Sequence, residues 1–197
     1  MQTPSQVYRS VLQGGITRRR SLGAAQKAVA RWALVDDYQA LLDLSCRDSR
    51  LLSFYSQRNH IRACGLCGDT ERAAQIKESL PEAEIMQGSP YDIPWQDNTF
   101  HAVMVSYPLG AYRGLGGLLS EIRRILRKGG QLLIALPIFP FVLQDLPLTG
   151  ESNRLLGPGA RRELLLTLEQ MGYEDVSIRH SNFGFATLVA RRGSGAR

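Results

Sequence analysis

The chain has 197 residues, of which 44% are hydrophobic and 21% are charged, and it contains three cysteines. This length provides for one domain with its own core, and the composition excludes a disordered or fibrous chain. The few cysteines exclude a secreted disulfide framework, and no apolar run reaches the roughly 20 residues of a membrane-spanning helix, so we expect a cytoplasmic protein.

The net charge of +6 belongs to the N-terminal part of the chain. No acidic residue precedes Asp36, whereas the rest of the chain carries 18 basic residues (24 minus 6) and all 18 acidic ones. Such a segment could attract an anionic substrate, nucleic acid or an acidic membrane surface, or it could be a solvated helix face. A twin-arginine export signal is disfavoured because polar residues interrupt the apolar region that it requires. The six basic residues are Arg9, Arg18, Arg19, Arg20, Lys27 and Arg31.

Residues 1–37 are therefore interpreted as a basic helical arm, and residues 38–197 as the main domain. Apolar residues recur at helical spacing in two stretches of the arm, which are separated by Gly14 and Gly15. We expect the arm to pack across the functional edge of the sheet that follows.

From residue 38 onward, apolar runs of strand length alternate with segments of helical period, which is typical of β-α-β units. Asp48 and Asp69 are placed as N-caps of the first two helices of this domain. Glycines 129 and 130 are placed as the stop of the next helix. The predicted helices are 48–59, 69–80, 115–127 and 160–171, and the predicted strands are 40–46, 61–67, 84–88, 101–106, 131–136, 174–180 and 185–191.

The last two strands are joined by a short turn at residues 181–184 and should form an antiparallel hairpin. The connection 137–159 is long and rich in proline, and we expect it to form part of the active-site rim. The predicted fold class is α/β: a doubly wound, Rossmann-like, seven-stranded and mostly parallel sheet with a C-terminal antiparallel hairpin.

Cys64 and Cys67 have the C-x-x-C spacing of redox and zinc sites. They fall in a predicted strand, where positions three apart point to opposite faces. We therefore expect two separate thiols and no metal site.

Four short segments of this domain have characteristic sequences. The first joins a strand, the acidic Asp43 and a turn into a helix, and the last is a helix followed by Lys128, Gly129 and Gly130. In this order and spacing they resemble class I S-adenosylmethionine-dependent methyltransferases of type 11, over residues 38–191. The resemblance implies a fold that holds S-adenosylmethionine at one edge of its sheet. The four segments are 41–49, 85–95, 97–103 and 121–130.

The sequence departs from this family in the cofactor loops. Ser45, Arg47 and Ser49 stand where the family's first motif has glycine, which serves unusual backbone angles and close ligand approach. A left-handed backbone at any of them would carry strain of about 1–2 kcal/mol. The Arg47 guanidinium could obstruct the site or bind the carboxylate of the cofactor.

Carboxylates are also missing from the family pattern. Cys67 replaces the acid that accepts hydrogen bonds from the ribose hydroxyls, and sulfur is a weak acceptor. Asp69 either reaches the ribose instead or only caps its helix. Ser89 replaces the acid that holds the adenine amino group, and His101 replaces an acid next to the fourth strand.

The resemblance also implies the positions of the site residues. Tyr107 and Tyr112 are the candidates for catalysis, as residues that position a nucleophile, with Arg113 for an anionic group. Tyr8 and His180 are further candidates, although such residues more often pack with a satisfied polar end. The residues expected to bind the cofactor are Asp43, Ser45, Cys46, Arg47, Cys67, Gly68, Ser89, Pro90, Tyr91 and Ser106.

We therefore expect an S-adenosylmethionine-dependent methyltransferase that acts on a small molecule. One alternative is a catalytically inactive binding or scaffold protein of the same fold, favoured by the substituted first motif. A second alternative is a nucleic-acid-binding protein that uses the basic arm, but no binding motif accompanies its arginines. Nothing in the sequence indicates an oligomeric state, and no motif supports a hydrolase, metalloenzyme or nucleoside-triphosphatase.

Overall fold

The computed structural model describes residues 22–58, 60–106, 114–138, 158–180 and 184–194. Helices and strands alternate along the chain, as the sequence predicts. In chain order they are α2 (Ala24–Trp32), β1 (Ala40–Asp43), α3 (Arg50–Ser56), β2 (Arg62–Cys67), α4 (Thr70–Ser79), β3 (Glu84–Gln87), β4 (Phe100–Val105), α5 (Leu115–Ile125), β5 (Leu126–Pro137), α6 (Pro158–Gln170), β6 (Tyr173–His180) and β7 (Phe185–Arg192).

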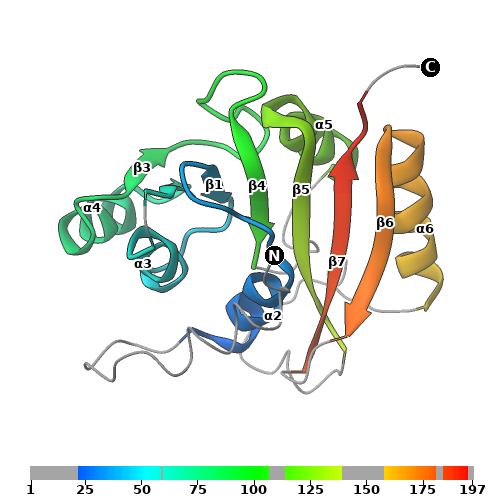
Figure 1. Ribbon diagram of the computed structural model, residues 1–197, viewed down its shortest axis with the longest axis horizontal. Coiled ribbons are helices and arrows are strands. Elements are labelled where there is room, and N and C mark those ends of the chain that lie inside the picture. The colour runs from blue at the N-terminus through cyan, green and yellow to red at the C-terminus, as the bar shows by residue number, and fades with distance from the viewer. Residues whose placement is uncertain (1–21, 59, 107–113, 139–157, 181–183, 195–197) are drawn as a thin grey trace.

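The seven strands form one sheet in the order β3-β2-β1-β4-β5-β7-β6 (Figure 1). Strands β1 to β5 pair in parallel, while β7 runs antiparallel between β5 and β6. The predicted fold class is therefore confirmed, including the antiparallel hairpin. From β1 the sheet continues through β2 and β3 on one side and through β4 and β5 on the other. The topological switch point therefore lies between β1 and β4.

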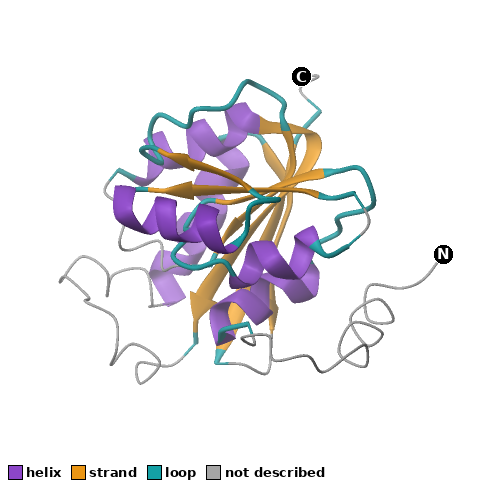
Figure 2. Ribbon diagram, turned by 90° about the vertical axis from the view of Figure 1, so that its left-hand side faces the viewer, coloured by secondary structure: helices purple, strands orange, loops and turns teal. Residues whose placement is uncertain are grey.

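Helices cover both faces of the sheet (Figure 2). Side chains of β5 alternate between two core clusters, with Leu132 and Ile134 on one side and Leu133 and Ala135 on the other. The first cluster includes residues of α5 and α6, and the second includes residues of α2, α3 and α4. None of the helices in the described ranges is long and apolar enough to cross a membrane.

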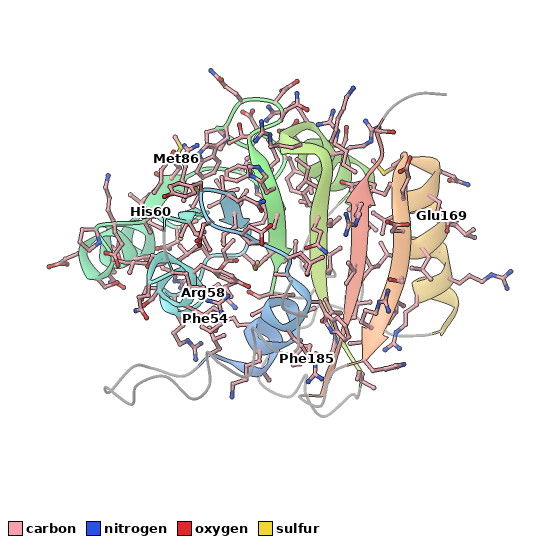
Figure 3. The ribbon with its side chains drawn as sticks, viewed as in Figure 1. Phe54, Arg58, His60, Met86, Glu169 and Phe185 are labelled. Atoms are coloured by element: carbon pink, nitrogen blue, oxygen red, sulfur yellow. The ribbon has the colours of Figure 1, made fainter. Side chains whose placement is uncertain are left out.

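Helix α2 lies on a face of the sheet, where it contacts β5 and β7. Its Ala28 carbonyl accepts a hydrogen bond of 2.8 Å from Thr187 Oγ1, and Phe185 at the start of β7 packs in the same core cluster (Figure 3). Its first turn also reaches the loop after β1, where Gln26 Nε2 donates to Asp48 Oδ1 at 3.2 Å. Helix α2 therefore packs on a face of the sheet with its first turn at the functional edge, and residues 1–21 of the arm lie outside the described ranges.

The structure moves two predicted boundaries near the site. Strand β1 ends at Asp43 rather than at residue 46, and the chain then turns. Helix α3 has Ser49 rather than Asp48 at its N-cap position, although the Asp48 side chain still accepts a hydrogen bond from the Arg50 amide at 2.9 Å. The Asp69 N-cap is confirmed, since its carboxylate accepts from the Arg72 amide at 2.7 Å.

Gly129 and Gly130 do not end α5, which stops at Ile125. They lie inside β5, next to an irregularity in its pairing with β4. A Cβ on Gly130 would come within 2.9 Å of the Arg127 carbonyl oxygen and 3.1 Å of that of Phe100. Gly130 therefore serves a close backbone approach within the sheet, whereas Gly129 has a positive φ of 74°, which favours glycine.

Candidate functional site

The loops after β1, β2 and β3 enclose a cleft of about 300 Å³. Ligands of doubly wound folds bind at the carboxyl ends of the parallel strands, where this cleft lies. Asp69 and Arg72 contribute to its lining at the start of α4. Six of the ten predicted cofactor residues also line it: Ser45, Cys46, Arg47, Cys67, Gly68 and Pro90.

The loop after β1 needs no glycine for its backbone conformation. The positive-φ residues of the described ranges do not include Ser45, Arg47 or Ser49, and Ser49 has a φ of −79°. The left-handed strain considered from the sequence is therefore absent at these positions. Arg47 is exposed and is one of the residues that line the cleft.

Ser45 joins the ends of β1 and β4 at the switch point. Its hydroxyl oxygen accepts a hydrogen bond of 3.0 Å from the Ser106 amide and lies 3.2 Å from the Ser106 hydroxyl. Ser106 itself does not line the cleft. We call this pair of contacts the Ser45–Ser106 clasp, and it spans the place where the two halves of the sheet diverge.

Asp43 lies beneath this loop and is 1% exposed. Its Oδ1 accepts hydrogen bonds from the Ser45 amide at 3.1 Å and the Ser45 hydroxyl at 3.3 Å. Among the described residues, its Oδ2 has no hydrogen-bond partner. Burial raises the pKa of Asp43 to about 7, and the charge of Asp48 contributes to the increase.

Asp48 is held differently, because its carboxylate is paired. It binds the Arg50 guanidinium and accepts a hydrogen bond from Gln26. Partial burial acts to raise the pKa of Asp48, but the hydrogen bonds from Arg50 and Gln26 outweigh it and hold that pKa below its usual value. This loop thus contains one ionised, paired carboxylate and one buried, half-partnered carboxyl.

The two cysteines in the cleft each donate a hydrogen bond to a backbone carbonyl of the loop that follows them. The thiol of Cys46 donates to the Asp48 carbonyl at 3.7 Å, and that of Cys67 donates to the Asp69 carbonyl at 3.3 Å. Burial, aided by the charge of Asp43, raises the pKa of Cys46 well above its usual range. Cys64 belongs to the core cluster on the α5 side, so the two cysteines of the C-x-x-C sequence face opposite sides of the sheet, as predicted.

The segment after β3 forms another wall of the cleft through Pro90. The Ser89 hydroxyl accepts a hydrogen bond from the Tyr91 amide at 3.2 Å, so it is engaged within its own turn. Ser89 and Tyr91 are both exposed, and neither lines the cleft.

Two charged residues of α5 hold this segment in place. The Glu121 carboxylate accepts a hydrogen bond from the Ile93 amide at 3.0 Å. The Arg124 guanidinium donates to the carbonyl oxygens of Ile93 and Trp95, both at 2.8 Å. Sequence reasoning noticed this stretch of α5 only as a family pattern and missed its role as the support of the cleft wall.

Comparison with known proteins points to one family. Residues 42–134 match the family model described as a methyltransferase domain. Over this region, just under half of the chain, the protein is similar to class I methyltransferases of type 11. The matched region begins in β1 and ends in β5, so it contains every loop of the cleft.

Individual relatives of the chain are distant. A demethylmenaquinone methyltransferase of Thermotoga maritima is 23% identical over 110 residues, which cover 55% of this chain and about half (48%) of the relative. A methyltransferase from Aquifex aeolicus has a similar structure, with a TM-score of 0.69, 16% identity and coverage of 98% and 100% of the two chains. The cyclase SpnF is equally similar, with a TM-score of 0.69, 17% identity and coverage of 98% of both chains.

The remaining predicted residues are not brought to the cleft. His180 is exposed at the end of β6 and does not line it. His101 lies at the start of β4, where its Nδ1 accepts from the Ala40 amide at 3.2 Å, so it belongs to the opposite edge of the sheet. Tyr8, Tyr107, Tyr112 and Arg113 lie outside the described residues, as do residues 139–157 of the predicted rim 137–159.

Proposed function

We propose that the cleft binds S-adenosylmethionine and that the protein transfers its methyl group to a small-molecule acceptor. The observation that carries this proposal is the position of the cleft, at the carboxyl edge of a methyltransferase-like sheet and within the region that matches the family. The sulfonium of the cofactor supplies the activated methyl group, so the protein has to bind, orient and exclude water.

The residues of the cleft fit the cofactor in part. The Arg47 guanidinium could bind a carboxylate of the ligand in bidentate fashion. Asp43 does not line the cleft and is 1% exposed, so its unpartnered Oδ2 lies behind the loop that a ligand would contact. Cys67 fits poorly, because its thiol already donates to Asp69 and sulfur accepts weakly from hydroxyls.

The acceptor is proposed to bind beyond the end of β4. Tyr107 and Tyr112 would position its nucleophile, and Arg113 would attract an anionic group of the acceptor. These roles rest on the resemblance to the family.

A second candidate function is a catalytically inactive binding protein of the same fold. The Ser45–Ser106 clasp favours it, because the clasp occupies the switch point at which the ligands of such folds bind. A binding assay shows whether the protein binds S-adenosylmethionine at all. Consumption of S-adenosylmethionine that depends on an acceptor then distinguishes an enzyme from a protein that only binds the cofactor.

Titration with S-adenosylhomocysteine tests the proposed function directly. A ligand at 100 times its dissociation constant adds about 2.7 kcal/mol of stability. For a chain of this size we expect this to raise the melting temperature by roughly 5–11 °C, measured by differential scanning calorimetry. The absence of any shift with S-adenosylmethionine or S-adenosylhomocysteine at millimolar concentration would contradict the proposal.

Ser45→Gly tests whether the clasp obstructs the cofactor. The substitution removes both contacts to Ser106 and opens the crevice between β1 and β4. We expect the affinity for S-adenosylhomocysteine to rise about tenfold, or about 1.4 kcal/mol, in calorimetric titration.

Ser49→Gly is the matched control for this experiment. It restores a glycine of the same motif, but Ser49 makes no side-chain cap hydrogen bond and does not line the cleft. Its affinity should stay within a factor of two of the native value, on the order of RT ln 2. Equal or weaker binding by Ser45→Gly would show that the clasp is compatible with the cofactor.

A further inference from the structure

We propose that the cleft binds a nucleoside that carries a phosphate on its ribose 2′ or 3′ oxygen, with Arg72 as the phosphate-binding residue. This inference goes beyond the proposed function, since it assigns a second ligand class to the same cleft and requires no methyl transfer. Three features of the ribose end of the cleft carry it.

The first feature is the lack of an acceptor for ribose hydroxyls at the end of β2. Doubly wound folds read an unmodified ribose with an acid at this place, about 20 residues after the first loop, and a phosphorylated ribose with a nearby arginine. Here the position holds Cys67, whose hydrogen is already donated to the Asp69 carbonyl at 3.3 Å. The arrangement therefore matches the second pattern, with Arg72 five residues further on.

The second feature is the charge of the lining. Two arginines, Arg47 and Arg72, line the cleft together with one acidic residue, Asp69. Oδ1 of the Asp69 carboxylate accepts a hydrogen bond from the Arg72 amide at 2.7 Å as the cap of α4. Arg72 is half-buried, and its guanidinium forms no ion pair with any residue in the described ranges.

The third feature is open space in the cleft at Gly68, four residues before Arg72. A Cβ on Gly68 would meet no atom within 4 Å. Helix α4 begins at Thr70, and the positive end of its dipole adds to the field of the guanidinium groups at this end of the cleft.

Charge also distinguishes the two ligand classes. S-adenosylmethionine carries a sulfonium, an ammonium and one carboxylate, so it is a net cation, whereas a ribose phosphate carries a charge of about −1.5 to −2 near neutral pH. A lining with two basic residues and one acidic residue favours the anion. The two ligands would compete because they share the cleft.

The test is calorimetric titration of the full chain with adenosine, its 2′-, 3′- and 5′-monophosphates, and S-adenosylhomocysteine. We expect the 2′- or 3′-phosphate to bind roughly 10- to 100-fold more tightly than adenosine, as hydrogen bonds to charged groups do. Raising the salt concentration should reduce this advantage.

Arg72→Gln should reduce the phosphate advantage to within about twofold, while Arg72→Lys should keep part of it. Lys77→Gln is the matched control, since it removes the same charge from the exposed last turn of α4 and lies outside the cleft. Both glutamine variants should keep the native melting temperature within about 2 °C, because each side chain is on the surface of one helix.

The outcomes separate this inference from the proposed function. If S-adenosylhomocysteine binds and no phosphate improves on adenosine, the inference is wrong and the proposed function stands. If the 2′- or 3′-phosphate binds and S-adenosylhomocysteine does not, the inference stands and the proposed function fails. The inference is overturned if Arg72→Gln still binds the 2′- or 3′-phosphate more tightly than adenosine. It is also overturned if a 5′-phosphate raises the affinity equally, or if none of these ligands binds.

Discussion

Replacing Asp43 by asparagine is expected to stabilise the protein at pH 8 by up to about 4 kcal/mol and by less than about 1 kcal/mol at pH 4. The carboxyl is 1% exposed, and burial raises its pKa from the usual 3.8 to about 7. The folded protein at pH 8 therefore holds an ionised carboxylate that would be better solvated in the unfolded chain.

The sign of this pH dependence follows from the direction of the shift. When folding raises the pKa of a carboxyl, the protein has its full stability at any pH below the pKa of that carboxyl in the unfolded chain. This stability is lost as the pH rises through the pKa of the carboxyl in the folded protein. For Asp43 the loss runs from about pH 4 to about pH 7. Asparagine keeps an oxygen that can accept from Ser45, so the variant removes the charge while the loop contacts persist.

The measurement is denaturant unfolding of both proteins at pH 4, 6 and 8. Asp37→Asn is the control, because Asp37 is exposed and its substitution should change stability by no more than about 0.5 kcal/mol at any of these values. An Asp43→Asn protein that is less stable than the native one at pH 8 would show that the ionised carboxylate has a donor that stabilises it.

Arg124→Met is expected to destabilise the protein by about 3 kcal/mol. Methionine keeps much of the apolar stem but removes the donors to the carbonyl oxygens of Ile93 and Trp95 and to the carboxylates of Glu121 and Asp97. The hydrogen bond from Arg124 also holds the pKa of Glu121 below its usual value, so the variant leaves that carboxylate without its cation.

Thermal unfolding should show the loss as a fall of roughly 6–12 °C in the melting temperature. Because the freed segment contains Pro90, we also expect weaker binding of any ligand of the cleft. Arg162→Met is the matched control on the exposed side of α6 and should shift the melting temperature by less than about 2 °C. A similar, small shift in both variants would contradict the assigned role of Arg124.

The order and type of all the strands could be predicted because the spacing of apolar residues shows which positions are buried, and this spacing differs between strands and helices. The prediction was wrong where one residue type serves two different structural purposes. Gly129 and Gly130 resemble a helix stop, but inside β5 Gly129 provides a positive φ and Gly130 allows a close backbone approach. Asp48 resembles an N-cap, and its carboxylate does accept a hydrogen bond from the Arg50 amide. However, Asp48 precedes the N-cap position of α3, Ser49, by one residue.

The candidate site was predicted in position but not in detail. Motif order brought Ser45, Arg47 and Cys67 to one cleft, since parallel strands end at the same edge. The clasp between Ser45 and Ser106 could not be predicted, because it joins residues 61 positions apart through a hydroxyl that the family lacks. The burial of Asp43 likewise depends on how the loop above it closes.

The position of β7 determines the order in which the sheet can be assembled. In the described sheet β6 pairs with β7 alone, and β7 is also the neighbour of β5. Until β7 is in place, β6 therefore has no partner strand and the edge of β5 remains open. Residues 185–192 complete both pairings at once, so the docking of β7 is the step of sheet assembly that closes this edge against aggregation.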